Sequence, residues 1–189
     1  MNARMLLVFL LLIITVTAYA ADSPQFRGTE RTGIFNESGL MKSWPEEGPN
    51  KLWTAAGFGI GYSSALVYKE HIYLTGTLAD QDSYVFVLTM DGTVTDKIYY
   101  GKDTPAEAAP GARCTPTIDG DRMYLLSGLG DVICIDLPTK QILWRINILE
   151  RFKAPNNEWH LAEALLIDGD HVICTPGGPI AVMPALDKN

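Results

Sequence analysis

Short apolar runs separated by turn residues recur along the chain and predict β-strands. The clearest unit is RCTPTIDGDRMYLLSGLGDVICIDLPTKQILWRINI, residues 113–148. Its first two apolar runs flank Asp119-Gly120, a pair that favours a tight hairpin because glycine tolerates a positive φ. A third run covers 132–136, and a fourth, containing Trp144, follows the turn at Pro138. The unit predicts a four-stranded antiparallel meander, the size of one propeller blade.

The same unit recurs on both sides of this stretch. In the earlier copy, SSALVYKEHIYLTG, Tyr73 aligns with Tyr124, and in the later copy, EALLIDGDHVICTPGG, Ile173 aligns with Tyr124. A spacing of about fifty residues is typical of arrays of supersecondary units that bury their faces against each other. We therefore predict an all-β fold, a β-propeller of four-stranded antiparallel blades that is incomplete in this chain. The blades are expected at about 62–100, 113–149 and 162–189, the last one truncated.

The N-terminus has the pattern of a signal peptide. Arg4 precedes the apolar run 5–14, and Ala18-Tyr19-Ala20 places small residues where a signal peptidase cuts. We predict that residues 1–20 are a signal peptide cleaved after Ala20, which places the protein in the periplasm or outside the cell. A retained anchor helix over 5–21 is the alternative. After cleavage we expect no stable membrane insertion.

Residues 21–50 are rich in glycine and proline and predict an irregular N-terminal arm. The partial propeller then covers 51–189. Trp53 lies in the phase of an outer, fourth strand that has no first three strands before it. We therefore predict that the segment near Trp53 is a closing strand, which completes the final blade of a longer propeller and removes sheet edges.

Charge and cysteine content limit the partners and the chemistry. A formal net charge of −7 disfavours nucleic acid and anionic membranes, whereas a protein or a small molecule stays open as a ligand. An exported protein can form disulfides, but the spacing of Cys114, Cys134 and Cys174 on predicted strands favours buried free thiols. No CxxC pair is present, and no metal site is predicted.

The segments SPQFRGTERTGI, SGLMKSWPEEGPNKLW and GYSSALV resemble the N-terminal region of secreted bacterial pyrroloquinoline quinone (PQQ) binding-like β-propeller repeat proteins. CIDLPTKQILW is similar to the repeat motif of that family, commonly ALDAATGKVLW, with Lys140 in place of the usual glycine. The resemblance implies the propeller fold. It is compatible with quinoprotein alcohol dehydrogenases and equally with non-enzymatic relatives such as the outer-membrane assembly scaffold lipoprotein.

Candidate ligand-binding residues are expected at one mouth of the propeller. First strands line the central axis, and the loops that enter them form a funnel where ligands usually bind. Arg113, Trp159, His160 and Glu163 are the polar or aromatic residues predicted there, as cofactor- or ligand-binding positions; ordinary loop packing is the alternative. Family enzymes stack PQQ on an aromatic ring and bind it through calcium. The resemblance implies these ligands for the enzymes, and Trp159 with residues 156–158 is the local cluster that offers an aromatic plane and oxygens.

No catalytic set is evident in the sequence. His71, Arg122 and His171 fall at equivalent positions after the three hairpin turns, which is typical of solvated strand entries and not of a catalytic base. The main hypothesis is therefore an exported binding or interaction scaffold. The alternatives are a PQQ-dependent alcohol dehydrogenase that uses PQQ with calcium, and an envelope protein assembly factor that pairs an extended peptide with a blade edge.

Overall fold

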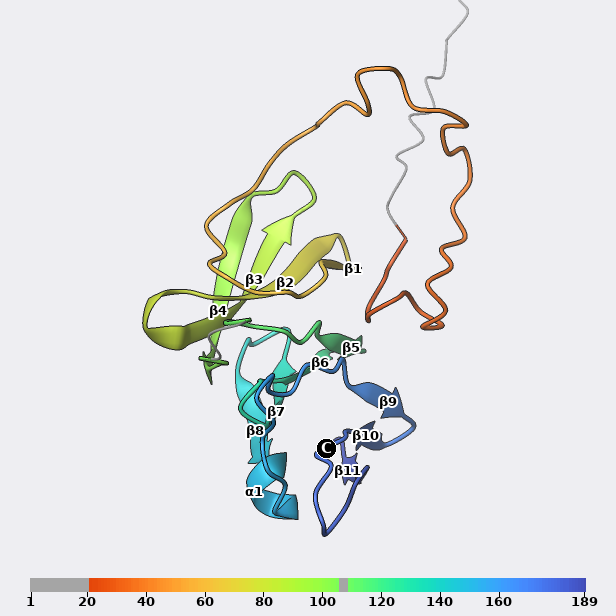
Figure 1. The fold of residues 1–189 in the computed structure, drawn as a ribbon. Helices are drawn as coiled ribbons and strands as arrows, with labels where there is room; N and C mark the ends of the chain where they lie inside the picture. The colour runs from red at the N-terminus through yellow and green to blue at the C-terminus, as the bar shows by residue number, and fades with distance from the viewer. Residues whose placement is uncertain (1–20, 106–108) are drawn as a thin grey trace, which may run out of the picture.

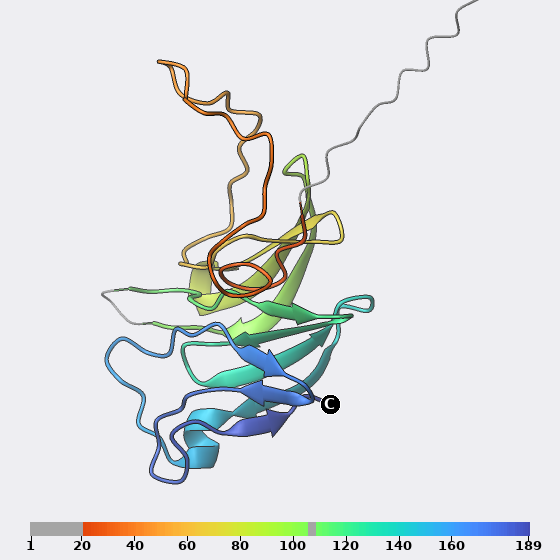
Figure 2. The same cartoon turned by 90° about the vertical axis from the view of Figure 1, so that its right-hand side faces the viewer.

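The computed structural model describes residues 21–105 and 109–189, so the predicted signal peptide lies outside the described residues. Three antiparallel sheets follow one another in chain order (Figure 1). A view turned by 90° shows them stacked from the yellow and green strands to the blue ones (Figure 2). Within the described residues, no helix has both the length and the apolar character required to cross a membrane.

Each sheet is an up-and-down meander in which chain neighbours pair. The first sheet has the order β1-β2-β3-β4 and the second β5-β6-β7-β8, whereas the third contains β9, β10 and β11. The strands are β1 Leu66–Tyr68, β2 His71–Thr77, β3 Asp82–Thr89, β4 Val94–Lys102, β5 Thr117–Asp119, β6 Arg122–Leu126, β7 Asp131–Asp136, β8 Ile142–Asn147, β9 Leu166–Asp168, β10 His171–Ile173 and β11 Ala185–Asp187. Stacked meanders of this kind are propeller blades. The predicted fold class is confirmed.

The hairpin turns form where the local sequence predicts them. Gly120 and Gly169 have φ angles of 60° and 54° at the tips of the β5–β6 and β9–β10 hairpins. The equivalent β1–β2 turn uses Lys69 and Glu70, both with positive φ. Paired positive φ angles give the turn a twist that matches the strands it joins.

The core is thickest in the second sheet. Met123, Tyr124, Leu125 and residues 132–135 are all fully buried, on both faces of β6 and β7. Both faces of a strand are buried only when its sheet packs between two others. The second sheet is therefore the middle blade, and the first and third cover it.

One local feature differs from the sequence-based expectation. The fourth apolar run of the repeat unit was expected to form a strand up to Ile148. Strand β8 ends at Asn147 instead, and a short helix, α1 Ile148–Phe152, follows it directly. The Asn147 side chain accepts a hydrogen bond from the Glu150 backbone N–H, a helix cap that competes with strand continuation.

Trp53 belongs to a loop at 51–59, and its ring lies against Gly92 in the β3–β4 turn. Its role in closing a further blade stays a prediction.

Candidate functional site

The N-terminal arm crosses the first strands of all three sheets. The Ser23 backbone N–H donates to the Val67 carbonyl in β1 (2.7 Å), and the Pro24 carbonyl accepts from Ile118 N–H in β5 (2.7 Å). Arg31 then donates to the carbonyls of Ala164 and Leu165, next to β9. Partial burial lowers the pKa of Arg31 from its ordinary value. The arm thus ties together three sheet edges that are far apart in the sequence.

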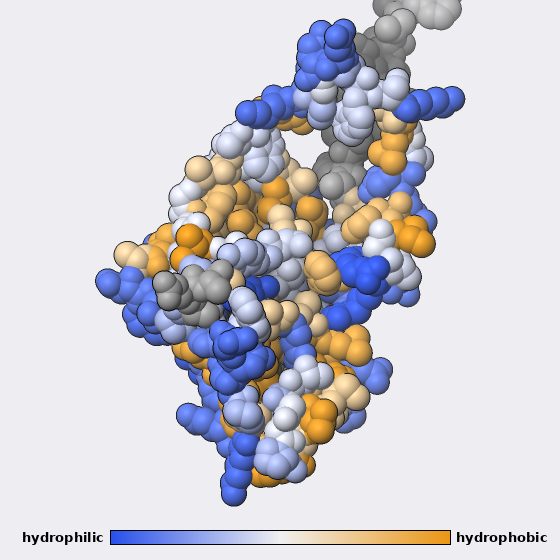
Figure 3. Space-filling model, viewed as in Figure 1, coloured by the Kyte–Doolittle hydropathy of each residue, from blue (hydrophilic) through white to orange (hydrophobic). Residues whose placement is uncertain are grey.

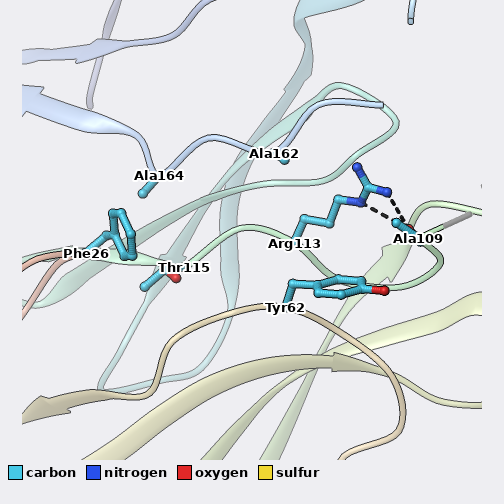
Figure 4. A pocket seen from close by; sticks show the side chains of 7 residues that line it. All are labelled: Phe26, Tyr62, Ala109, Arg113, Thr115, Ala162 and Ala164. Carbon is cyan, nitrogen blue, oxygen red and sulfur yellow. Dashed lines mark hydrogen bonds between the residues drawn. The ribbon is translucent and has the colours of Figure 1, made fainter. Parts of the chain in front are cut away.

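Beside the arm, a cavity of about 370 Å³ opens at the entry to the first strands (Figure 4). Tyr62, Arg113 and Ala162 contribute to its lining, and they hold equivalent positions before β1, β5 and β9. Phe26 from the arm closes one side. The remaining lining residues are Ala109, Thr115 and Ala164. One position from each blade therefore converges on a single site, here called the mouth cavity.

Arg113 is the charged side chain of this lining. Its Nε donates to the Ala109 carbonyl (3.1 Å), and its Nη1 donates to the Trp159 carbonyl. The guanidinium also lies 6.0 Å from the centre of the Tyr62 ring. These contacts fix the guanidinium between the entries of the second and third blades. Nη2 also donates to the Ala109 carbonyl (2.5 Å), so three of the five N–H groups make these bonds and the other two can bind an acidic group.

Trp159 and His160 lie next to this arginine but do not line the cavity. The Trp159 side chain is 54% exposed, and its backbone N–H bonds to the Asn157 side chain (2.8 Å). The His160 Nδ1 lies 2.5 Å from the Thr104 hydroxyl, which belongs to the segment after β4. Trp159 thus serves the site through its backbone carbonyl, and His160 links the third blade entry to the first blade.

Glu163 takes part in a hydrogen bond that all three blades repeat. In each blade, a side chain at the entry to the first strand accepts a hydrogen bond from a backbone N–H near the end of the second strand. The donor lies within the last three residues of β2, at the end of β6 and two residues beyond β10. The pairs are Ser63 with Thr75 (3.0 Å), Cys114 with Leu126 (3.2 Å) and Glu163 with Thr175 (2.8 Å). The first strands are short, so this N–H has no strand partner and the side chain replaces it. The Glu163 side chain therefore has a structural role, as the acceptor of this hydrogen bond.

The three cysteines are free and buried, as the sequence predicted. Burial raises the pKa of the Cys114 thiol to about 12, and it does the same for Cys174. A thiol of this pKa is protonated at neutral pH and is a poor nucleophile. Cysteine chemistry therefore does not contribute to the mouth cavity.

Asp103, which no pattern in the sequence singles out, lies between the first and second blades and is fully buried. Its carboxylate accepts hydrogen bonds from the Tyr100 hydroxyl, the Thr104 N–H and the Gly128 N–H, each at 2.7 Å. Burial raises the pKa of Asp103 above its ordinary value. Through Thr104 the network continues to His160. Asp103 therefore fixes the relative position of the blade entries that surround the cavity.

The donor set at the mouth does not fit a calcium-bound quinone. Calcium requires several oxygen ligands, usually with carboxylates among them. Within 21–105 and 109–189, no three His, Cys, Asp or Glu side chains gather as a metal site, and the mouth lining has no carboxylate. In the predicted cluster around Trp159, the Asn156 amide donates to the Gly128 carbonyl (2.9 Å) and the Asn157 oxygen accepts from Trp159. Both amides serve local backbone groups.

The chain was compared with protein families, curated proteins and solved structures. No protein-family model matches the sequence, and no curated protein matches it. Among solved structures, the chain is similar to BamB from Moraxella catarrhalis, with 15% identity and a TM-score of 0.45 over 75% of this chain and 38% of that one. It is also similar to a europium-containing methanol dehydrogenase, with 14% identity and a TM-score of 0.39 over 60% of this chain and 19% of that one. The chain spans well under half the length of each.

Proposed function

We propose that this chain is part of an exported β-propeller scaffold that binds a small acidic ligand at the mouth cavity. The observation that carries the proposal is the convergence of Tyr62, Arg113 and Ala162, one from each blade, on one cavity. Its volume of about 370 Å³ is within the range of small-molecule sites. The arm and the Asp103 network fix the walls before any ligand arrives, which lowers the entropic cost of binding.

The lining indicates the chemistry of the ligand. Arg113 favours a carboxylate or another acidic group, because a guanidinium matches such groups in charge and geometry. Phe26 and Tyr62 offer aromatic surface on the arm side and the first-blade side of the same cavity. The best match is an acid with a flat apolar body. The lining has no group placed to act as a general base, so the proposal is binding without catalysis.

Calorimetric titration with benzoate tests the proposal, with benzamide as the uncharged analogue. Benzoate is expected to bind more tightly than benzamide, and Arg113→Ala is expected to weaken benzoate binding by about tenfold or more, the typical value of a charged hydrogen bond. Arg151→Ala is the matched control, since Arg151 lies on the exposed side of α1. Equal binding of benzoate and benzamide, or an unaffected Arg113→Ala variant, would contradict the proposal.

The enzyme alternative has its own experiment. The protein is mixed with PQQ and calcium, and cofactor retention and dye-linked alcohol oxidation are measured. Stoichiometric retention together with turnover would replace the scaffold proposal by a dehydrogenase. Export is tested separately, because N-terminal sequencing of the secreted or periplasmic protein should begin at Ala21.

A polypeptide ligand is the second candidate, and the exposed apolar side chains of the arm favour it. Figure 3 shows apolar surface along the arm as well as on the blades. The most exposed of these residues are Ile34 (73%), Leu40 (72%) and Trp44 (67%) in the arm and Leu52 (88%) just after it. Apolar surface of this kind is typical of protein-binding segments. Fluorescence anisotropy with a labelled unfolded polypeptide should show binding that the double variant Trp44→Ser, Leu52→Ser loses; equal binding by both proteins would exclude this candidate.

A further inference from the structure

A groove lies between the first and second blades, at the hairpin-tip end of their first strands. It consists of two adjoining cavities of about 210 Å³ and 220 Å³, which share His71, Tyr73 and Leu137. The other residues that line it are Val87, Asp96, Ile98, Lys140, Tyr68, Lys69, Asp121 and Pro138. The mouth cavity lies at the opposite end of the same strands. This second site, here called the junction groove, is therefore separate from the proposed acid site.

The equivalent junction between the second and third blades is closed by Trp144. Its indole N–H donates to the Lys188 carbonyl (3.3 Å), and the same carbonyl accepts from the Tyr124 hydroxyl (3.2 Å) and from Arg122 (3.0 Å). The ring also packs against Tyr124, with the two ring centres 6.0 Å apart. An aromatic side chain of the middle blade thus holds the next blade by a backbone carbonyl.

Strand register shows which residue replaces Trp144 in the first blade. In the second blade Tyr124 pairs with Cys134, which pairs with Trp144. In the first blade Tyr73 pairs with Val87, which pairs with Asp96. Tyr73 and Tyr124 are equivalent, since each pairs with the first residue of its first strand. Asp96 therefore occupies the position equivalent to Trp144. Its shorter side chain does not fill the space that an indole ring would take, and this space is part of the junction groove.

The carbonyl that would receive the indole is also in place. Leu137 N–H bonds to the Asp121 carbonyl (2.9 Å), just as Lys188 N–H bonds to the Asp170 carbonyl (3.0 Å). Leu137 is therefore the equivalent of Lys188, and it lines the groove. Lys140 reaches Asp96 from the second blade and forms an ion pair with it. This pair joins the two blades at the groove, where an indole joins them at the other junction.

We propose that the junction groove binds a planar aromatic ring with an N–H donor, of the indole type. The ring would lie among Tyr73, Val87 and Ile98, and its N–H would donate to the Leu137 carbonyl, as the Trp144 N–H does to Lys188. The occupant is argued from the internal copy of the same junction, in which a side chain of this chemistry fills the same space. The ring can belong to a free small molecule or to a tryptophan of a peptide.

Titration with indole and with N-acetyl-tryptophanamide, followed by ligand-observed NMR, tests the proposal and separates these two sources. Asp96→Trp places an indole in the groove covalently and is expected to abolish binding. Glu150→Trp, on the exposed side of α1, adds the same ring elsewhere and is expected to leave binding unchanged. Trp144→Ala should open the second junction and add a second binding event. Binding by Asp96→Trp equal to that of the wild type would overturn the proposal.

Two further measurements keep the proposal falsifiable if a variant does not fold. In the wild-type protein, indole should shift the methyl NMR signals of Val87 and Ile98, and shifts confined to other methyl groups would overturn the assignment. 1-Methylindole has the same ring without the N–H donor and should bind more weakly. Equal binding by indole and 1-methylindole would show that the Leu137 carbonyl is not the acceptor. Failure of the acid-binding proposal at Arg113 leaves these results unaffected, because the two sites share no residue.

Discussion

Replacing Asp103 by alanine tests whether the blades are locked together by a buried polar network. The carboxylate is fully buried and accepts hydrogen bonds from Tyr100, Thr104 and Gly128. These donors belong to the end of the first blade, the following segment and the β6–β7 turn of the second. Asp103→Ala removes all three acceptor contacts at once and leaves the donors without partners in a space that water does not reach.

The magnitude follows from the number of donors left unpaired. Each unsatisfied buried donor costs about 1–3 kcal/mol, and breaking one side of a buried charged network costs about 3–5 kcal/mol. We expect the free energy of unfolding to fall by about 3–5 kcal/mol in Asp103→Ala. Asp103→Asn retains an oxygen for the two backbone N–H groups, and the Tyr100 hydroxyl can rotate to accept from the amide. We expect it to lose only about 1 kcal/mol.

Urea unfolding at neutral pH measures these changes. The control is Glu46→Ala in the exposed arm, whose free energy of unfolding should stay within about 0.5 kcal/mol of the wild-type value. A pH series adds a second check. Burial raises the pKa of Asp103 above 3.8, so folding favours its protonated form. Its contribution to stability is therefore highest below pH 3.8 and falls as the pH rises through the folded pKa, a dependence that Asp103→Asn should lack. A folded Asp103→Ala variant whose free energy of unfolding falls by less than about 1 kcal/mol would refute the reasoning.

Three further predictions concern the arm, a close packing contact and a buried thiol. In Gly128→Ala the new Cβ would lie 2.2 Å from the Thr104 hydroxyl, and overpacking should cost about 1–3 kcal/mol, seen as a lower Tm; an unchanged Tm would contradict the packing. Arg31→Ala should speed amide hydrogen exchange across residues 22–31, and unchanged exchange would mean that the arm is held by other contacts. Cys114, with its pKa raised to about 12, should resist iodoacetamide at about pH 8 until the protein unfolds, whereas rapid labelling of the folded protein would show that the thiol is accessible.

Some of the site could be foreseen because it depends on local chemistry. Asp119-Gly120 and Asp168-Gly169 specify hairpins through residues that tolerate a positive φ, so the three blades could be placed and their first-strand entries expected at one mouth. Arg113 was predicted at this mouth, and it lines the cavity. Glu163 was predicted there as a polar residue of the loop that enters the third blade. Its hydrogen bond to Thr175 is recognisable only when Ser63 and Cys114 are seen making the same contact.

The replacement of Trp144 by Asp96 could not be derived from the spacing that aligns the hairpins. That constant shift would align Trp144 with Thr93, but β2 and β3 (7 and 8 residues) are longer than β6 and β7 (5 and 6 residues) and displace the fourth strand of the first blade. Register in a sheet is fixed by backbone pairing and not by sequence distance. The bond partners of Asp103 likewise come from separate blades.

The sequence by itself determined that this protein is built of repeated antiparallel hairpins, because alternation and turn residues act over a few neighbours. Only the tertiary structure decided that the arm crosses three first strands, that Arg113 meets Tyr62, and that one blade junction is filled while the other is open. Those outcomes depend on how the blades stack and on how long the paired strands of each blade are. They involve groups many residues apart, whose approach no local pattern encodes.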